Sequence, residues 1–229
     1  MIISSDKITI SSSRPNRGVS LLSQRLYSLA RYHSDHESVW DIGCDHGLLG
    51  LSFCHTNHVK VIHLVDPSIK VIKVLEAKVK DSYITIPVKI CIQHEFGQRI
   101  KLDNEKKIIF IAGMGGKEIE LIARHLIPQM HEGDSLVVSP HRNFLALRSF
   151  LGSTELGLFD ELVIKEDELF YQVICLIKSS HLPKITRFGD KIWKGIDGEE
   201  YRQHILRTFS IHQDQASREL VSHLEQLST

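Results

Sequence analysis

Short, continuous apolar runs alternate along this chain with longer segments that carry apolar residues at helical spacing. Such runs, rich in Val, Ile and Leu, are typical of strands buried on both faces. They predict strands at Ser38–Trp40, Lys60–Val65, Val88–Ile92, Lys107–Ala112 and Ser135–Ser139. The helical spacing predicts helices at Leu48–Cys54, Ile69–Lys80, Lys117–Gln129 and Phe144–Leu151, and one more before the first strand, on Leu21, Leu22, Leu26, Leu29 and Ala30. The alternation indicates a doubly wound, mostly parallel α/β sheet.

The pattern changes after the fifth strand. Two strand-like runs, Leu158–Lys165 and Phe170–Lys178, are joined by a short acidic bend, so we expect a terminal antiparallel hairpin. That ending is typical of Rossmann-like, class I methyltransferase sheets rather than of dehydrogenases. Beyond it, Glu199–Leu227 carries apolar residues at helical spacing and predicts an amphipathic helix or a pair of helices, a short α-helical C-terminal extension.

Length and composition divide the chain into three expected parts. Its 229 residues suit one medium-sized domain with an appendage. We expect a flexible leader at 1–18, a main domain at 19–180 and the helical extension at 181–229. The four cysteines are scattered, and no apolar run reaches the roughly 18 residues that a membrane helix needs. A cytoplasmic protein is therefore expected.

Charge gives a weaker signal. The formal net charge is zero, which argues mildly against a dominant nucleic-acid surface. Basic residues nevertheless gather near both ends of the chain, where they could meet phosphates or form an ordinary solvated surface, and the second interpretation is favoured: Arg14, Arg17, Arg25, Arg31, Lys184, Arg187, Lys191 and Lys194. The segment Cys54–His58 has no second cluster at metal-ligand spacing, so no metal site is expected.

The first strong motif follows the first strand. It has the spacing Asp41-x-Gly43-x-x-x-Gly47, which differs from the Gly-x-Gly-x-x-Gly of dinucleotide sites. Glycines in a turn after a strand let the backbone approach a ligand closely. An acidic residue ahead of them favours S-adenosylmethionine (SAM), whose methionine end carries an ammonium.

A second acidic residue, Asp66, ends the second strand more than twenty residues after the glycines. A carboxylate at this place commonly holds a ribose diol. The competing interpretation is a helix N-cap ahead of the helix at Ile69–Lys80. The ribose role is favoured because two independent signals lie at the expected separation.

The second strong motif follows the fourth strand, where three glycines occur within Gly113-Met114-Gly115-Gly116. Ligands bind at the carboxyl ends of strands in open α/β sheets, so this bare backbone is expected to shape the site rather than only to form a tight turn. The sequence Ser139-Pro140-His141 ends the fifth strand and opens onto the same edge.

Together these motifs resemble the bacterial TrmK family of SAM-dependent tRNA (adenine-22-N1)-methyltransferases. The resemblance runs from about Leu22 to Lys178. It rests on Arg25-Leu26, on Asp41-Ile-Gly-Cys-Asp-His-Gly, on Ala112-Gly-Met-Gly-Gly, and on Phe159-Asp-Glu-Leu-Val-Ile-Lys-Glu-Asp with Tyr171. It implies SAM as the cofactor, a tRNA as the partner and N1 of an adenine as the target.

The resemblance also implies roles for individual residues. Arg25, Asp41, Gly43 and Asp45 would surround the methionine portion of SAM. The ribose would be held by Asp66, and the adenine of SAM would lie beside Gln93 and Glu95. The edge of methyl transfer would be lined by Gly113, Met114, Gly115 and Gly116. The candidate catalytic residues are Asp45, His46 and His141.

The chain departs from the family at several positions. Ser139-Pro140-His141 replaces a common Gln-Pro-Asn, so an imidazole stands where the family has an amide, and His94-Glu95-Phe96 replaces Gly-Asp-Gly. Two alternatives therefore stay open: a methyltransferase of a small molecule, and a SAM-binding module without catalysis. A monomer and a homodimer are equally open.

Overall fold

The computed structural model describes residues 22–82, 88–189, 191–212 and 214–227. The expected leader at 1–18 lies outside the described residues. The elements lie in this order: α1 (Gln24–Ala30), β1 (Ser38–Ile42), α2 (Leu48–Leu51), β2 (Val61–Asp66), α3 (Ile69–Ser82), β3 (Lys89–His94), η1 (Gly97–Arg99), β4 (Lys107–Met114), α4 (Gly116–Leu126), η2 (Ile127–Gln129), β5 (Ser135–Pro140), α5 (Phe144–Gly152), β6 (Leu156–Glu166), β7 (Leu169–Lys178), η3 (Ile192–Lys194), α6 (Gly198–Phe209) and α7 (Gln215–Gln226).

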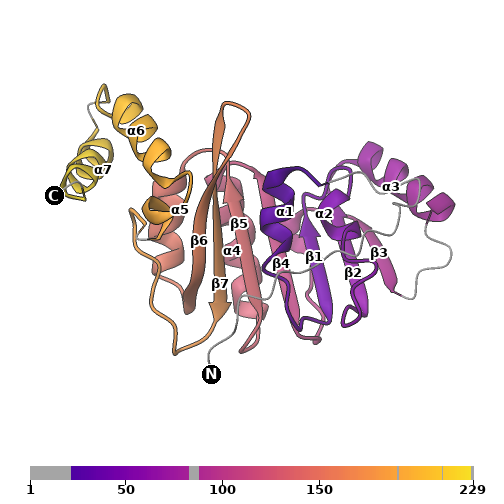
Figure 1. The fold of residues 1–229 in the computed structure, drawn as a ribbon. Helices are drawn as coiled ribbons and strands as arrows, with labels where there is room; N and C mark the ends of the chain where they lie inside the picture. Colours follow the sequence, from indigo (N-terminus) through magenta and orange to yellow (C-terminus); the bar gives the residue numbers. More distant parts are fainter. Residues whose placement is uncertain (1–21, 83–87, 190, 213, 228–229) are drawn as a thin grey trace.

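A seven-stranded sheet forms the centre of the molecule, in the order β3-β2-β1-β4-β5-β7-β6 (Figure 1). The first five strands are parallel, and β7 pairs antiparallel with both β5 and β6. The predicted Rossmann-like methyltransferase sheet with its terminal hairpin is therefore confirmed.

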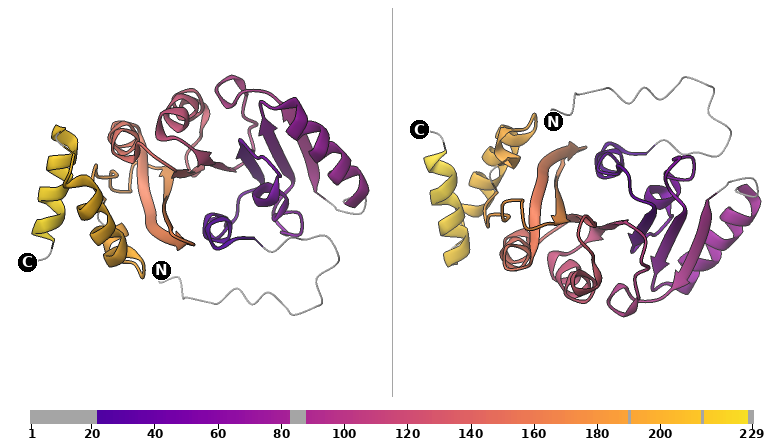
Figure 2. Two further views of the ribbon diagram at one scale, coloured as in Figure 1. Left: turned by 90° about the horizontal axis from the view of Figure 1, so that it is seen from above. Right: turned by 90° about the horizontal axis from the view of Figure 1, so that it is seen from below.

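Both faces of the sheet are covered, as the continuous apolar runs predict. Along β4, Ile109 and Ile111 belong to a core on the side of α4 and α5, whereas Ile108 and Phe110 belong to a core on the side of α1, α2 and α3. Figure 2 shows α4 and α5 on one side of the sheet and α1 on the other. None of the helices in the described part is long and apolar enough to span a membrane.

Two helices are shorter than their apolar patterns predict. The helix expected at Leu48–Cys54 ends at Leu51, because the amides of Phe53 and Cys54 bond to carbonyls three residues back and tighten the chain. The helix expected up to Gln129 ends at Leu126, and a 3₁₀ turn follows. Pro128 has no amide hydrogen to continue the α-helix there.

The C-terminal extension is a pair of helices packed beside the hairpin, beyond edge strand β6 (Figure 1). Tyr201 on α6 accepts a hydrogen bond from Gln172 on β7, at 2.9 Å, and stacks on Trp193. Trp193 is itself buried, and its indole N–H donates to the carbonyl of Gly189. Trp193 therefore packs within the extension.

Candidate functional site

A cavity of about 390 Å³ opens at the carboxyl end of the parallel strands, beside the neighbouring strands β1 and β4. Open α/β sheets bind ligands at this edge. Seven of the residues expected at the site line it, together with five others: Arg25, Asp41, Gly43, Asp45, His46, Gly113 and His141, with Leu26, Cys44, Leu48, Leu49 and Ala112.

Asp41 lies inside β1 rather than in the turn after it, and it is only 5% exposed. One of its carboxylate oxygens, Oδ2, accepts the amide of Gly50 at 2.9 Å. The pKa of Asp41 is raised to about 7. Burial is the main cause, the hydrogen bond from Gly50 opposes it, and the charges of Asp66 and Asp45 add to it. Among the described residues, the two charged groups that act on Asp41 are thus both carboxylates. A cationic ligand would offset the repulsion between these negative charges.

Gly50 is the site residue that the sequence analysis missed. A Cβ atom at this position would lie 2.5 Å from Cδ2 of Leu64 and 3.1 Å from Cβ of Asp41. A larger residue would thus have to displace Leu64 and Asp41, whereas the glycine lets α2 approach β1 closely enough to donate its amide to Asp41. The signal in the sequence is a glycine inside a helical pattern, where it is unfavourable by about 1 kcal/mol unless packing requires it.

The turn between β1 and α2 is held in an unusual backbone conformation. Gly43 has φ +72°, and Asp45, which is not a glycine, has φ +48°. The amide of Asp45 donates to Oδ2 of Asp66 at 3.2 Å, which ties this turn to the end of β2. The side chains of Asp45 and His46 are about 70% exposed at the cavity, with Oδ2 and Nε2 3.7 Å apart.

Asp66 is buried and does not line the cavity. Its second oxygen, Oδ1, accepts the amide of Ser68 at 2.8 Å, just ahead of α3. Ser68 precedes α3, which begins at Ile69, so this bond lies in the turn before the helix and shows neither the N-cap nor the ribose role. The ribose role itself stays a prediction.

Gly113 leaves the end of β4 open. Its φ is +78°, and a Cβ atom at this position would have no heavy atom of the described residues within 4 Å. The pairing of β4 with β5 shifts register here, between Ala112 and Met114. Packing does not require a glycine at this position, so the left-handed backbone and the free space beside the cavity are what it provides. Met114 and Gly115 follow it but do not line the cavity.

Arg25, His141 and Tyr171 form a cluster at one wall of the cavity. A guanidinium nitrogen of Arg25, Nη1, lies 2.8 Å from Nε2 of His141, and the guanidinium lies 4.8 Å from the centre of the Tyr171 ring. The Nε atom of Arg25 is buried and has no hydrogen-bond partner among the described residues. An unpaired buried donor at a cavity wall is suited to an acceptor on a ligand.

Gln93 and Glu95 are not brought to the cavity. The amide of Gln93 bonds to Nδ1 of His63 at 3.0 Å, and Nε2 of His63 lies 3.0 Å from Asp103. Glu95 accepts the amide of Phe96 at 2.8 Å. The expected contact of Gln93 and Glu95 with the adenine of SAM is a prediction that this geometry does not test.

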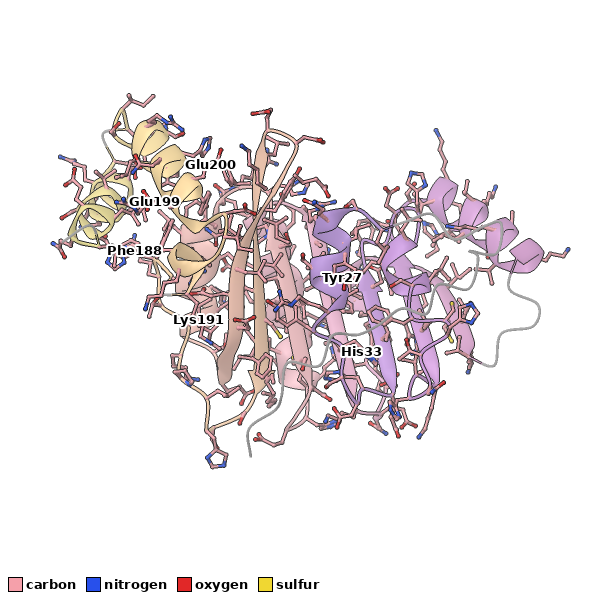
Figure 3. The ribbon with its side chains drawn as sticks, in the orientation of Figure 1. Tyr27, His33, Phe188, Lys191, Glu199 and Glu200 are labelled. Carbon is pink, nitrogen blue, oxygen red and sulfur yellow. The ribbon has the colours of Figure 1, made fainter. Side chains whose placement is uncertain are left out.

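The basic residues near the C-terminus are used by the fold. Lys184 donates to the carbonyls of Thr154 and Leu156, and Lys191 donates to that of Phe159. Arg187 pairs with Glu219. Figure 3 shows Lys191 beside the extension, away from Tyr27 on α1. Of these three residues, Arg187 is paired with a carboxylate, whereas Lys184 and Lys191 donate to carbonyls and keep their charge at the surface.

Comparisons with known proteins agree with this fold. The tRNA (adenine(22)-N(1))-methyltransferase of Bacillus subtilis strain 168 is 28% identical over 153 residues, which cover 67% of this chain and 63% of that protein. The chain spans less than two thirds of the length of the curated relatives that it matches.

Solved structures show the same likeness. The M1A22 tRNA methyltransferase TrmK of B. subtilis superposes with a TM-score of 0.63 at 20% identity, over 90% of this chain and 94% of that one. TrmK of M. capricolum, solved with S-adenosyl-homocysteine, superposes with a TM-score of 0.68 at 19% identity, over 91% and 97%. The resemblance to TrmK is thus confirmed. Residues 22–174 match the family model described as a methyltransferase domain, and the chain therefore belongs to that family.

Proposed function

We propose that this protein transfers a methyl group from SAM to N1 of an adenine in tRNA, at position 22. The observation that carries the proposal is the buried carboxylate of Asp41, whose charged neighbours are both anionic and which lines a cavity at the carboxyl edge of the sheet. Relatives and solved structures named as tRNA adenine-N1 methyltransferases support the choice of target.

The cavity fits the amino-acid end of SAM. Asp41 offers a carboxylate to its ammonium, and the unpaired Nε–H of Arg25 offers a donor to its carboxylate. Gly43 lines the same space. We place the ribose at Asp66 and the adenine beside Gln93 and Glu95. Met114 and Gly115 would line the transfer edge. For these five residues the support is the resemblance to TrmK.

The reaction requires little chemistry from the protein. When bound, SAM supplies a methyl group whose bond to sulfur breaks, with the electron pair left on sulfur, as the bond to N1 forms. N1 of adenine has a free lone pair, so no residue has to remove a proton. Alignment alone can supply roughly 7–11 kcal/mol of the barrier.

The remaining task of the protein is to stabilise positive charge that develops on the adenine. The exposed carboxylate of Asp45 and the open backbone at Gly113 both lie at the cavity and would stabilise this positive charge. His46 and His141 line the same cavity and would orient the base by hydrogen bonds. The target adenine has to leave its stack to reach them.

In this proposal residues 19–180 form the catalytic domain, residues 181–229 form a helical extension, and the protein works in the cytoplasm. A small-molecule target is the second candidate. It is favoured by the formal net charge of zero and by the imidazole of His141, which stands where the TrmK family commonly has an amide.

The test is methyl transfer from labelled SAM to unmodified tRNA transcripts, followed by mass spectrometry of the nucleosides. 1-Methyladenosine at position 22 is the expected product, and a transcript with guanosine at that position is the control. SAM binding without any methylated RNA would contradict the proposal and favour the small-molecule or non-catalytic alternative.

Asp45→Asn separates catalysis from cofactor binding, because Asn also tolerates the left-handed backbone of this position. We expect turnover to fall by about tenfold or more, as charge stabilisation is lost. The dissociation constant of SAM, measured by calorimetry, should change much less. Equal losses in both quantities would show that Asp45 serves cofactor binding alone.

A further inference from the structure

The contact between Arg25 and His141 fixes the protonation state of the imidazole. An arginine side chain only donates hydrogen bonds, and Nη1 of Arg25 lies 2.8 Å from Nε2 of His141. Nε2 must therefore carry its lone pair and act as the acceptor. The ring is neutral, and its single proton is on Nδ1.

The surroundings of His141 support this state. The pKa of His141 is lowered by partial burial and by the positive charges of Arg25 and Arg142, so the neutral form prevails at neutral pH. The Tyr171 ring lies edge-on to the imidazole, with the centroids 5.5 Å apart. The amide of His141 donates to the carbonyl of Met114 at 3.0 Å, which fixes the residue beside the end of β4.

Arg25 is itself held in place by the terminal hairpin. Its amide donates to Oε1 of Glu166 at the end of β6, and its guanidinium lies over the ring of Tyr171 on β7. The hairpin, α1 and the end of β5 thus meet at one imidazole. An asparagine amide, in contrast, can donate and accept and has no tautomer for Arg25 to select.

We propose that His141 recognises the target base through Nδ1–H, as a hydrogen-bond donor whose tautomer Arg25 enforces. This role of His141 rests on the proposed function, which places an adenine of tRNA in the cavity. The acceptor is a ring nitrogen of the adenine other than N1, either N7 or N3, because N1 has to keep its lone pair for the methyl group. A purine carries such an acceptor in addition to the reacting nitrogen.

The tautomer is tested without any activity. Long-range ¹H–¹⁵N spectra at pH 8 should show a protonated Nδ1 and an unprotonated Nε2 for His141, assigned by the loss of its signals in His141→Asn. In Arg25→Met the preference for this tautomer should be lost while the signals of the other histidines stay unchanged. His46, which lines the same cavity and faces Asp45 through Nε2, is the internal comparison. A protonated Nε2 on His141 in the parent protein would overturn the proposal.

The contact with the base is tested with tRNA that carries 7-deazaadenosine or 3-deazaadenosine at the target position. With the parent protein one of the two analogues should lower kcat/KM by about tenfold or more, because Nδ1–H loses its acceptor. With His141→Phe the same analogue should cause no further loss, since the two changes remove one interaction. Additive losses for both analogues would overturn the proposal. Absence of 1-methyladenosine with the parent protein and ordinary tRNA would overturn the proposed function as well.

Discussion

Buried charge occurs in two regions of this molecule, and the two are built in opposite ways. At the junction between the hairpin and the C-terminal extension, Arg148 and Glu161 are both fully buried, with Nη2 and Oε2 2.6 Å apart. Two further nitrogens of Arg148, Nε and Nη1, donate to the carbonyl of Thr186 and to the side chain of Gln172. This charge pair is complete within the protein.

At the cavity the carboxylate of Asp41 is also buried, but the charged groups acting on it are Asp66 and Asp45. Nearby, Nε of Arg25 has no partner in the described part of the chain. A buried charge without its counter-ion is costly unless something else supplies one. The difference teaches that the junction stabilises the fold, whereas the cavity is arranged for a ligand that carries a cation for Asp41 and an anion for Arg25.

Breaking the complete pair should cause the largest effect. Arg148→Met leaves Glu161 buried without its guanidinium partner, and we expect the free energy of unfolding to fall by about 3–5 kcal/mol. Urea unfolding followed by circular dichroism measures this. Arg187→Met, which breaks the exposed pair with Glu219, is the matched control and should cost about 1 kcal/mol or less. Equal losses in the two variants would show that the buried pair does not hold the junction.

Removing the incomplete charge should affect binding rather than folding. In Asp41→Ala, SAM affinity should fall by about 30-fold or more, as for the loss of one partner of a buried charge pair. Calorimetry measures the affinity, and circular dichroism checks that the variant is folded. Unchanged affinity in a folded variant would reject Asp41 as the ammonium-binding residue.

The close approach of α2 to β1 can be tested at Gly50. Gly50→Ala places a Cβ atom against Leu64 and Asp41, and we expect stability to fall by about 1–3 kcal/mol together with a loss of SAM affinity. Gly195→Ala is the control, because the one heavy atom of the described residues near its Cβ would lie 4.0 Å away and its φ is −74°. A harmless Gly50→Ala would mean that the helix does not position the carboxylate.

A change of one pH unit should have the smallest effect. The folded-state pKa of Asp41 is raised to about 7, above the value of 3.8 for an unperturbed Asp, so between these values the native state holds a proton that the unfolded state has lost. The ligand-free protein therefore loses stability as pH rises from about 4 to about 7, by at most roughly 1.4 kcal/mol per unit, because ionisation of Asp41 favours the unfolded state.

Binding of SAM should show the opposite sign, because its ammonium favours the ionised carboxylate. We expect SAM affinity to rise with pH up to about 7 and then to level off. Asp41→Asn, which cannot titrate, should remove both dependences when it is compared with the parent protein at each pH. The same pH profiles in both proteins would show that another group is responsible.

Much of the fold was predictable from the chain because its signals are local. The apolar runs predict all seven strands, with each end within two residues of the observed one. Strands buried on both faces tolerate few polar side chains, so the runs are easy to find. The glycine motifs after β1 and β4 indicated the edge at which the cavity opens. Asp41, Asp45 and Gly113 were predicted from these motifs and do line it.

Other features depend on contacts between distant segments, which a single sequence does not display. Arg148 lies in an apolar helix and Glu161 in a strand that alternates with polar residues, and nothing in either segment indicates that they pair. Gln93 lies in β3, near the edge at which the cavity opens, yet its side chain bonds to His63.

The sequence by itself determined the alternation of strands and helices, the terminal hairpin and the two glycine-rich turns, because hydrophobic period and backbone freedom are properties of neighbouring residues. Only the tertiary structure decided which charged side chains find an oppositely charged partner inside the protein and which do not. Burial, pairing and tautomer depend on what packs against a side chain. The pKa of Asp41 is raised, and the proton of His141 is held on Nδ1, only because β1, α1, α2 and the hairpin meet around one cavity.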